Sequence, residues 1–211
     1  TNIIETLKSE GDRVVDAAKT EQEDLRKALI ETTENTITQM MSSAGFAQFT
    51  DREIAALEKL KEAYAKGNLF EDDFVNEVEK FITPIGSITS AFSGARDAAA
   101  EFSKEVNKLE QKQLTPFDGA IDAAEGLMRQ IDMLNEGMRD RAKSDLDKLP
   151  EDLKEQYNSL ISALEDKLGV TKLGIDDVKD YVNILNAARQ RLIDSQAELK
   201  KLATIQKRFT K

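Results

Sequence analysis

The segment "IDDVKDYVNILNAARQRLIDSQAELKKLATIQKRF", residues 175–209, decides the fold class. Apolar residues recur in it at intervals of seven, at Val178, Leu185, Leu192 and Leu199. A heptad period held over four repeats places one apolar stripe along one side of a long α-helix, as in coiled coils. We therefore predict a helix from Ile175 to Phe209 that packs against its neighbours through a coiled-coil-like antiparallel seam.

The N-terminal part of the chain has the same helical character. Residues 2–44 contain no proline and a single glycine, and their apolar residues are spaced three, four and seven apart. This predicts one long helix, with a break near Gly11 as the alternative. Thr50 and Glu53 match the capping box that begins a helix, and Gly67 is placed to end it. The acidic triplet at 71–73 then suits the first turn of a third helix, where acids complement the helix dipole.

Further helices follow in the second half. A fourth is predicted from residue 87 to Gln113. A fifth is predicted to begin at Thr115–Pro116, because proline is well tolerated at the first helical position, and its apolar face runs to Met138. Pro150 and Gly169 bound a sixth helix.

The connections between these helices are short, which favours antiparallel neighbours. The predicted fold class is therefore all-α: an elongated antiparallel helical bundle of five to seven helices, with long first and last helices and coiled-coil-like packing. No repeat or low-complexity linker divides the sequence. We predict a single helical-bundle domain over residues 1–211.

The composition narrows the function. The net charge of −10 disfavours nucleic acid as a partner, because phosphate neutralisation supplies most non-specific affinity for it. The chain contains no Cys and no His, which removes thiolate chemistry and the commonest general base and metal ligand. The acidic clusters lie on adjacent helical positions, about 100° apart, and do not converge on a metal. We predict a protein that is not an enzyme and binds no metal and no cofactor.

Two uncharged stretches, residues 35–50 and 81–95, stand out in a chain of which 33% is charged. An up-and-down helical path brings both to the same end of the bundle. There they would form an apolar tip that binds a partner, made of Met40, Met41, Phe46, Phe49, Ile85, Ile88 and Phe92. The competing interpretation is a small-residue corner at which two helices pack closely.

A basic patch closes the chain. It consists of Lys200, Lys201, Lys207, Arg208 and Lys211. Such a patch is typical of a surface that meets acidic partners or a membrane, but cations are also the expected complement of a helix C-terminus.

The sequence thus favours a non-enzymatic helical interaction protein that presents an extended acidic surface and an apolar tip to a protein partner. The alternative is a lipid- or membrane-interacting amphipathic bundle, including an α-helical pore-forming type. Residues 81–95 are short for crossing a hydrocarbon layer of about 30 Å and contain several hydroxyl side chains, which argues against spanning. The polar, thiol-free composition and the first residue, Thr1, favour a secreted or cell-surface protein, with the cytoplasm as the alternative location. The oligomeric state is left open.

Overall fold

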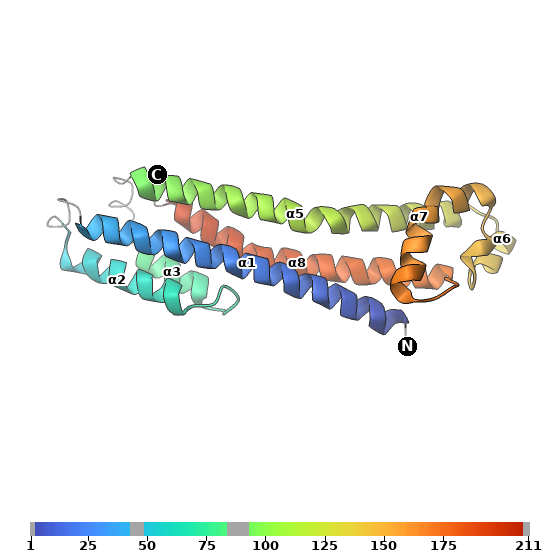
Figure 1. Cartoon of the computed structure of the whole chain (residues 1–211), viewed down its shortest axis with the longest axis horizontal. Helices are drawn as coiled ribbons and strands as arrows, with labels where there is room; N and C mark the ends of the chain where they lie inside the picture. Colours follow the sequence, from blue (N-terminus) through green and yellow to red (C-terminus); the bar gives the residue numbers. More distant parts are fainter. Residues whose placement is uncertain (1–2, 43–48, 84–92, 209–211) are drawn as a thin grey trace. The chain divides into compact units, whose positions relative to one another are not determined.

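The computed structural model describes residues 3–42, 49–83 and 93–208. Within these ranges the chain forms seven α-helices, one short 3-10 helix and no strand (Figure 1). The elements are α1 (Ile3–Ser42), α2 (Asp51–Lys66), α3 (Phe74–Ile82), α5 (Ser93–Asp132), α6 (Glu136–Ala142), η3 (Leu146–Lys148), α7 (Glu151–Leu168) and α8 (Ile175–Arg208). The predicted all-α bundle with long first and last helices is confirmed, since α1 has 40 residues and α8 has 34.

Local sequence signals set several helix ends as predicted. The Glu53 N–H donates to Thr50 Oγ1 over 3.3 Å and the Thr50 N–H donates to Glu53 Oε2 over 2.6 Å, which is the capping box of α2. Gly67 ends α2, and Gly169 ends α7 with a φ of 63°, a left-handed conformation that favours glycine.

The predicted helix boundary at Thr115–Pro116 is wrong, because α5 runs through it without a break. A proline inside a helix removes one backbone hydrogen bond and costs about 3 kcal/mol. The helix persists because its buried side chains continue on both sides of the proline, with Phe102 and Val106 before it and Phe117 and Ile121 after it. Packing of this continuous stripe outweighs the local cost.

Two smaller differences concern helix starts and ends. The acidic triplet at 71–73 precedes α3, which begins at Phe74 with Asp73 as its N-cap. The predicted fifth helix was expected to reach Met138, but α5 ends at Asp132 and Met138 belongs to α6.

The contacts divide the chain into two compact units. Unit 1 comprises Thr1–Ala17 and Gln113–Leu192, and unit 2 comprises Ala18–Lys112 and Ile193–Lys211. The three long helices α1, α5 and α8 contribute residues to both units. The prediction of one domain over the whole chain stays a prediction.

Unit 2 packs α2 and α3 against segments of α1, α5 and α8. Its core contains buried residues from all five helices, among them Ile37, Leu57, Val78, Phe102 and Leu199. Polar contacts join α1 to α8, since Gln22 Nε2 donates to Ser195 Oγ over 3.1 Å in the interior of the unit. Leu199, the last position of the heptad pattern predicted from the sequence, belongs to this core.

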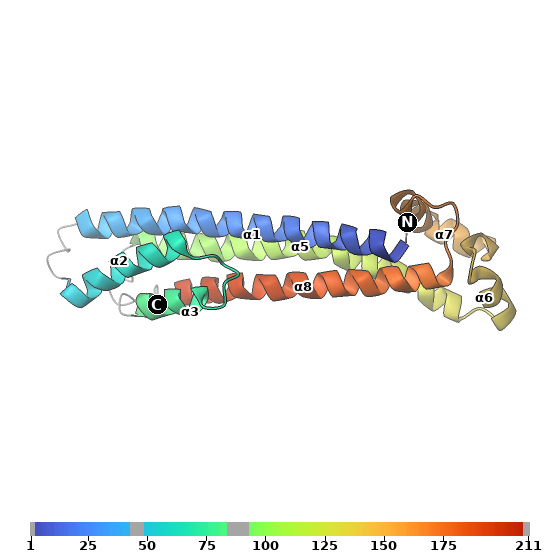
Figure 2. The ribbon, with the colours of Figure 1, turned by 90° about the horizontal axis from the view of Figure 1, so that it is seen from below.

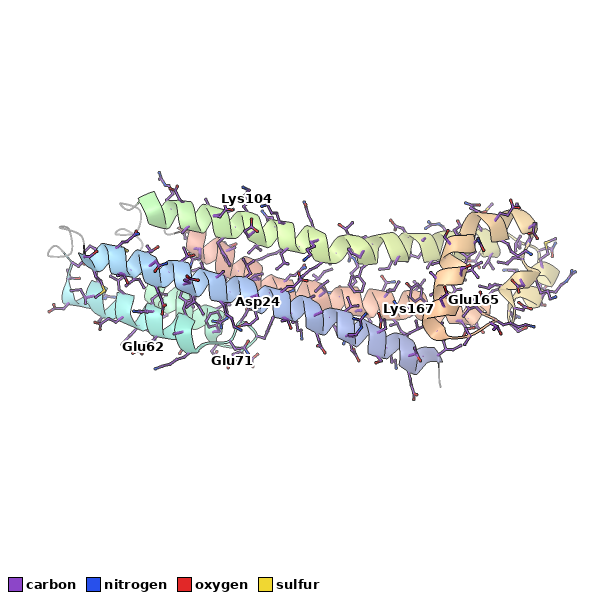
Figure 3. The ribbon with its side chains drawn as sticks, in the orientation of Figure 1. Asp24, Glu62, Glu71, Lys104, Glu165 and Lys167 are labelled. Atoms are coloured by element: carbon purple, nitrogen blue, oxygen red, sulfur yellow. The ribbon has the colours of Figure 1, made fainter. Side chains whose placement is uncertain are left out.

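Unit 1 gathers α6, η3 and α7 around the second part of α5 and the first part of α8 (Figure 2). Its core contains Leu7, Leu127, Ile131, Leu164 and Val178, all buried. Glu10 of α1 and Lys167 of α7 form an ion pair over 3.7 Å, which supports the packing of α7 on α1. Lys167 and its neighbour Glu165 are labelled in Figure 3.

Candidate partner-binding surface

The turn between α5 and α6 in unit 1 is closely tied by hydrogen bonds. The Leu134 N–H donates to the Ile131 carbonyl over 3.0 Å, and the Met133 N–H donates to the Gln130 carbonyl over 3.2 Å. Asn135 then begins α6 as its N-cap, because its side-chain oxygen accepts from the Met138 N–H over 2.9 Å. These bonds hold the backbone of the turn in one conformation.

This turn carries two exposed methionines, Met133 and Met138, which are termed here the methionine corner. Met133 is 80% exposed and Met138 is 38% exposed. In the described part of the chain the only other exposed large hydrophobic residue is Ile4 on α1. Ile131 is buried in the core of unit 1, whereas Met133, two residues further on and past the end of α5, is exposed. A well-ordered turn therefore presents a large apolar side chain to solvent.

A groove lies beside the methionine corner, between α5 and α8. It has a volume of about 390 Å³ and shares Asp132 and Lys179 with a neighbouring hollow of about 220 Å³ at α6. We treat the two as one continuous surface, termed the α5–α8 groove. Its apolar lining is Met128, Ile131, Ile175 and Val182.

The rim of the groove carries charges of both signs. Its acidic residues are Glu125, Asp132, Glu136, Asp140 and Asp176. Its basic residues are Arg129, Arg139, Lys143 and Lys179. The rim is therefore close to neutral.

Only part of this charge is paired within the chain. Lys143 Nζ lies 2.7 Å from an Asp140 carboxylate oxygen, and the Lys143 ammonium holds the pKa of that carboxyl below its usual value. Lys179 lies 4.0 Å from Asp176. Among the described residues, Arg129 and Arg139 form no ion pair, and neither do the three remaining rim acids. The groove thus carries two guanidinium groups that form no ion pair within the described chain.

The apolar tip predicted from the sequence is only partly described. Met40 is fully buried in the core of unit 2, and Met41 and Phe49 are half-buried against that core. Phe46, Ile85, Ile88 and Phe92 lie outside the described residues. The structure therefore places the described members of the tip in or against the core, and partner binding at the tip stays a prediction.

The predicted basic patch has acidic neighbours. Lys200 pairs with Glu110, Lys201 with Glu198 over 2.8 Å, and Arg208 with Glu79 over 2.7 Å. Lys207 is exposed, and Lys211 lies outside the described residues. Three of the five cations thus take part in ion pairs within unit 2, and partner binding by the basic patch stays a prediction.

A buried polar cluster lies inside unit 2, around Arg26. Its side chain is 6% exposed, pairs with Glu23 over 2.5 Å and donates from Nη1 to the Tyr64 carbonyl over 2.8 Å. That carbonyl belongs to the last turn of α2, where it has no partner within the helix. The guanidinium also lies 5.3 Å from the centre of the Phe74 ring. This cluster joins α1 to α2 and α3 and is too buried to bind a ligand.

The phenol of Tyr64 belongs to the same cluster. It accepts a hydrogen bond from the Gln206 side-chain amide of α8, and burial raises its pKa well above the usual value. The ring meets Phe74 edge to face, with centroids 6.0 Å apart. The phenol therefore stays protonated and acts in packing.

Sequence reasoning missed the methionine corner. It placed Met138 on the apolar face of a helix that was expected to continue, whereas α5 ends six residues earlier, at Asp132. The signal that could have revealed the turn is Asn135, since asparagine is among the best N-cap residues and its side chain caps α6.

Other kinds of site receive no support from the described residues. No group of three or more carboxylates in them lies close enough together to hold a metal ion. Among the helices that the structure describes, none is long and apolar enough to cross a membrane. Comparisons of the chain with protein-family models, with curated proteins and with solved structures found no match.

Proposed function

We propose that this chain is a non-enzymatic helical interaction protein that binds a protein partner through the methionine corner and the α5–α8 groove of unit 1. The observation that carries the proposal is the 80% exposure of Met133 on a hydrogen-bonded turn. Complete burial of a methionine side chain contributes about 1.5–3 kcal/mol. A partner that covers Met133 and Met138 would gain much of this energy at a small surface.

The neighbouring groove supports the same proposal. Methionine side chains are flexible and polarizable, and they are over-represented at surfaces that adapt to a partner. A partly apolar floor surrounded by charges has the anatomy of a protein interface, in which the apolar centre supplies affinity and the polar rim supplies specificity. The lipid- or membrane-interacting alternative stays a prediction.

Affinity capture from the native source tests the proposal. The bait is the full chain, compared with a variant in which Met133→Gln and Met138→Gln are combined. The control is Ile4→Gln, because Ile4 is the remaining exposed large hydrophobic residue in the described ranges and also belongs to unit 1. Any protein that the double variant loses is then purified, and its affinity is measured directly.

We expect the double variant to bind the purified partner at least about tenfold more weakly, which corresponds to about 1.4 kcal/mol. Ile4→Gln should bind it as the unmodified chain does. Equal binding by all three proteins would contradict the proposal, and so would capture of vesicles in place of any protein.

A further inference from the structure

One patch of unit 1 carries both a projecting apolar side chain and a hollow. Met133 is 80% exposed and follows directly after Asp132, which lines the α5–α8 groove. In a two-fold symmetric interface the same patch serves both copies, so residue i of one copy meets residue j of the other and the reverse. A knob beside a hole satisfies this requirement, because each copy can fill the hollow of the other.

The charge of the rim differs from that of the rest of unit 1. Unit 1 contains 20 acidic and 13 basic residues, a net charge of −7. The rim holds five of these acids and four of these bases, so it carries a net charge of −1. Two acidic surfaces repel each other, and they approach most easily where the local charge is balanced. The groove is therefore a suitable place for unit 1 to meet its own copy.

The unpaired charges of the rim are also complementary to themselves. Arg129 and Arg139 form no ion pair in the described chain, and neither do Glu125, Asp132 and Glu136. A planar guanidinium binds a carboxylate through two parallel hydrogen bonds, which fixes the register of two surfaces. Arg129 of one copy facing Asp132 of the other would form such a contact twice about the two-fold axis.

We infer that the partner of the α5–α8 groove is a second copy of this chain, with Met133 of each copy in the groove of the other and Arg129 of each copy facing Asp132 of the other. The inference rests on the proposed function, since it names the partner of the same surface. A segment of a different protein is the competing occupant.

Analytical ultracentrifugation of the full chain over a wide concentration range tests the inference. We expect a concentration-dependent equilibrium between monomer and dimer. The combined Met133→Gln and Met138→Gln variant should raise the dimer dissociation constant by at least about tenfold, and Ile4→Gln should leave it unchanged. Circular dichroism checks that each variant keeps the helical content of the unmodified chain.

A charge exchange tests the two-fold arrangement itself. Arg129→Glu places two acids opposite each other in its own dimer, and Asp132→Lys places two bases opposite each other. Each variant alone should therefore be mainly monomeric. An equimolar mixture should form a mixed dimer, because both contacts across the axis then join opposite charges. Native mass spectrometry distinguishes the mixed dimer from either parent.

Three results would overturn the inference. A chain that stays monomeric at every concentration excludes the second copy, while the capture experiment still decides whether the corner binds another protein. A dimer that persists in the methionine and charge variants lies on another surface. Loss of the dimer in both charge variants without recovery in the mixture excludes the Arg129–Asp132 contact.

Discussion

Two ion pairs on α1 have the same spacing and opposite surroundings. Arg13 of unit 1 lies 2.7 Å from Glu10, and Arg26 of unit 2 lies 2.5 Å from Glu23, each three residues apart. The Arg13 side chain is 72% exposed, whereas that of Arg26 is 6% exposed. The pairs differ because the end of α2 and Phe74 of α3 cover Arg26. The contribution of an ion pair to stability therefore depends on the elements that pack over it and not on the spacing of its residues along the helix.

The same contrast extends to the two units. Unit 2 places a cation in its interior and satisfies it with a carboxylate, a helix-terminal carbonyl and an aromatic face. Unit 1 leaves Arg129 and the thioether of Met133 at the surface. Buried polar groups stabilise one arrangement of helices when they are fully satisfied, whereas exposed apolar and unpaired charged groups are available to a partner. This contrast is the reason why the proposed partner surface is assigned to unit 1 and the largest stability effect is expected in unit 2.

The largest effect is expected at Arg26. Replacement by Ala leaves Glu23 and the Tyr64 carbonyl without their donor, and one oxygen of Glu23 is already buried without a hydrogen-bond partner. Breaking a largely buried pair in this way should lower the free energy of unfolding by about 3 kcal/mol. Urea denaturation followed by circular dichroism measures the change.

Arg13→Ala is the matched control, because it removes the same side chain at the same spacing from an exposed pair. It should change stability far less than Arg26→Ala does, because solvent screens the exposed pair. Equal losses in the two variants would show that burial does not distinguish the two pairs.

A second prediction compares two glycines. A Cβ at Gly67 in unit 2 would lie 2.1 Å from the Phe74 ring, so Ala at this position must displace the ring that covers Arg26. Gly67→Ala should therefore destabilise the protein by about 2 kcal/mol. Gly119 lies inside α5 in unit 1, and apart from its chain neighbours and the backbone of its own helix no atom lies within 4 Å of its Cβ position. Gly119→Ala should therefore stabilise the protein by up to about 1 kcal/mol.

Thermal unfolding of the two variants should move in opposite directions. The sign of the change in melting temperature matters more than its size. Opposite signs would show that glycine is tightly packed at position 67 in unit 2 and lies on open helix surface at position 119 in unit 1. A stabilised Gly67→Ala variant would mean that the Phe74 ring can move without loss.

The features that were predicted correctly depend on residues that are close together in the sequence. The capping box at Thr50 and Glu53 and the terminal Gly169 act over three or four residues, and a local pattern identifies them. The burial of Arg26 could not be predicted in this way, because α2 and α3 provide its partners and its pattern equals that of Arg13. The helical path through Pro116 likewise depends on packing along both sides of the proline.

The candidate site shows the same division. The uncharged stretches drew attention to an apolar tip, and Met40, the described member that is most buried there, belongs to the core of unit 2. Met133 gave no such signal, since with Ile131 and Leu134 it continues the apolar spacing of the helix before it. Its exposure follows from the end of α5 at Asp132, which the continuous helical pattern concealed.

The smallest predicted effect concerns pH and the exposed pair in unit 1. The hydrogen bond from Arg13 lowers the pKa of the Glu10 carboxyl below its usual value, and Lys167 acts in the same direction. A carboxyl whose pKa is lower in the folded state adds stability above its unfolded pKa and loses it as the pH falls through the folded value. Glu10→Gln removes that contribution, so at pH 7 the variant should be less stable than the unmodified chain by less than about 1 kcal/mol. The difference should vanish as the pH falls below the folded pKa of Glu10. High salt should shrink the difference at pH 7, because the pair is exposed to solvent. A difference that persisted in acid would show that Glu10 acts through packing of α7 and not through its charge.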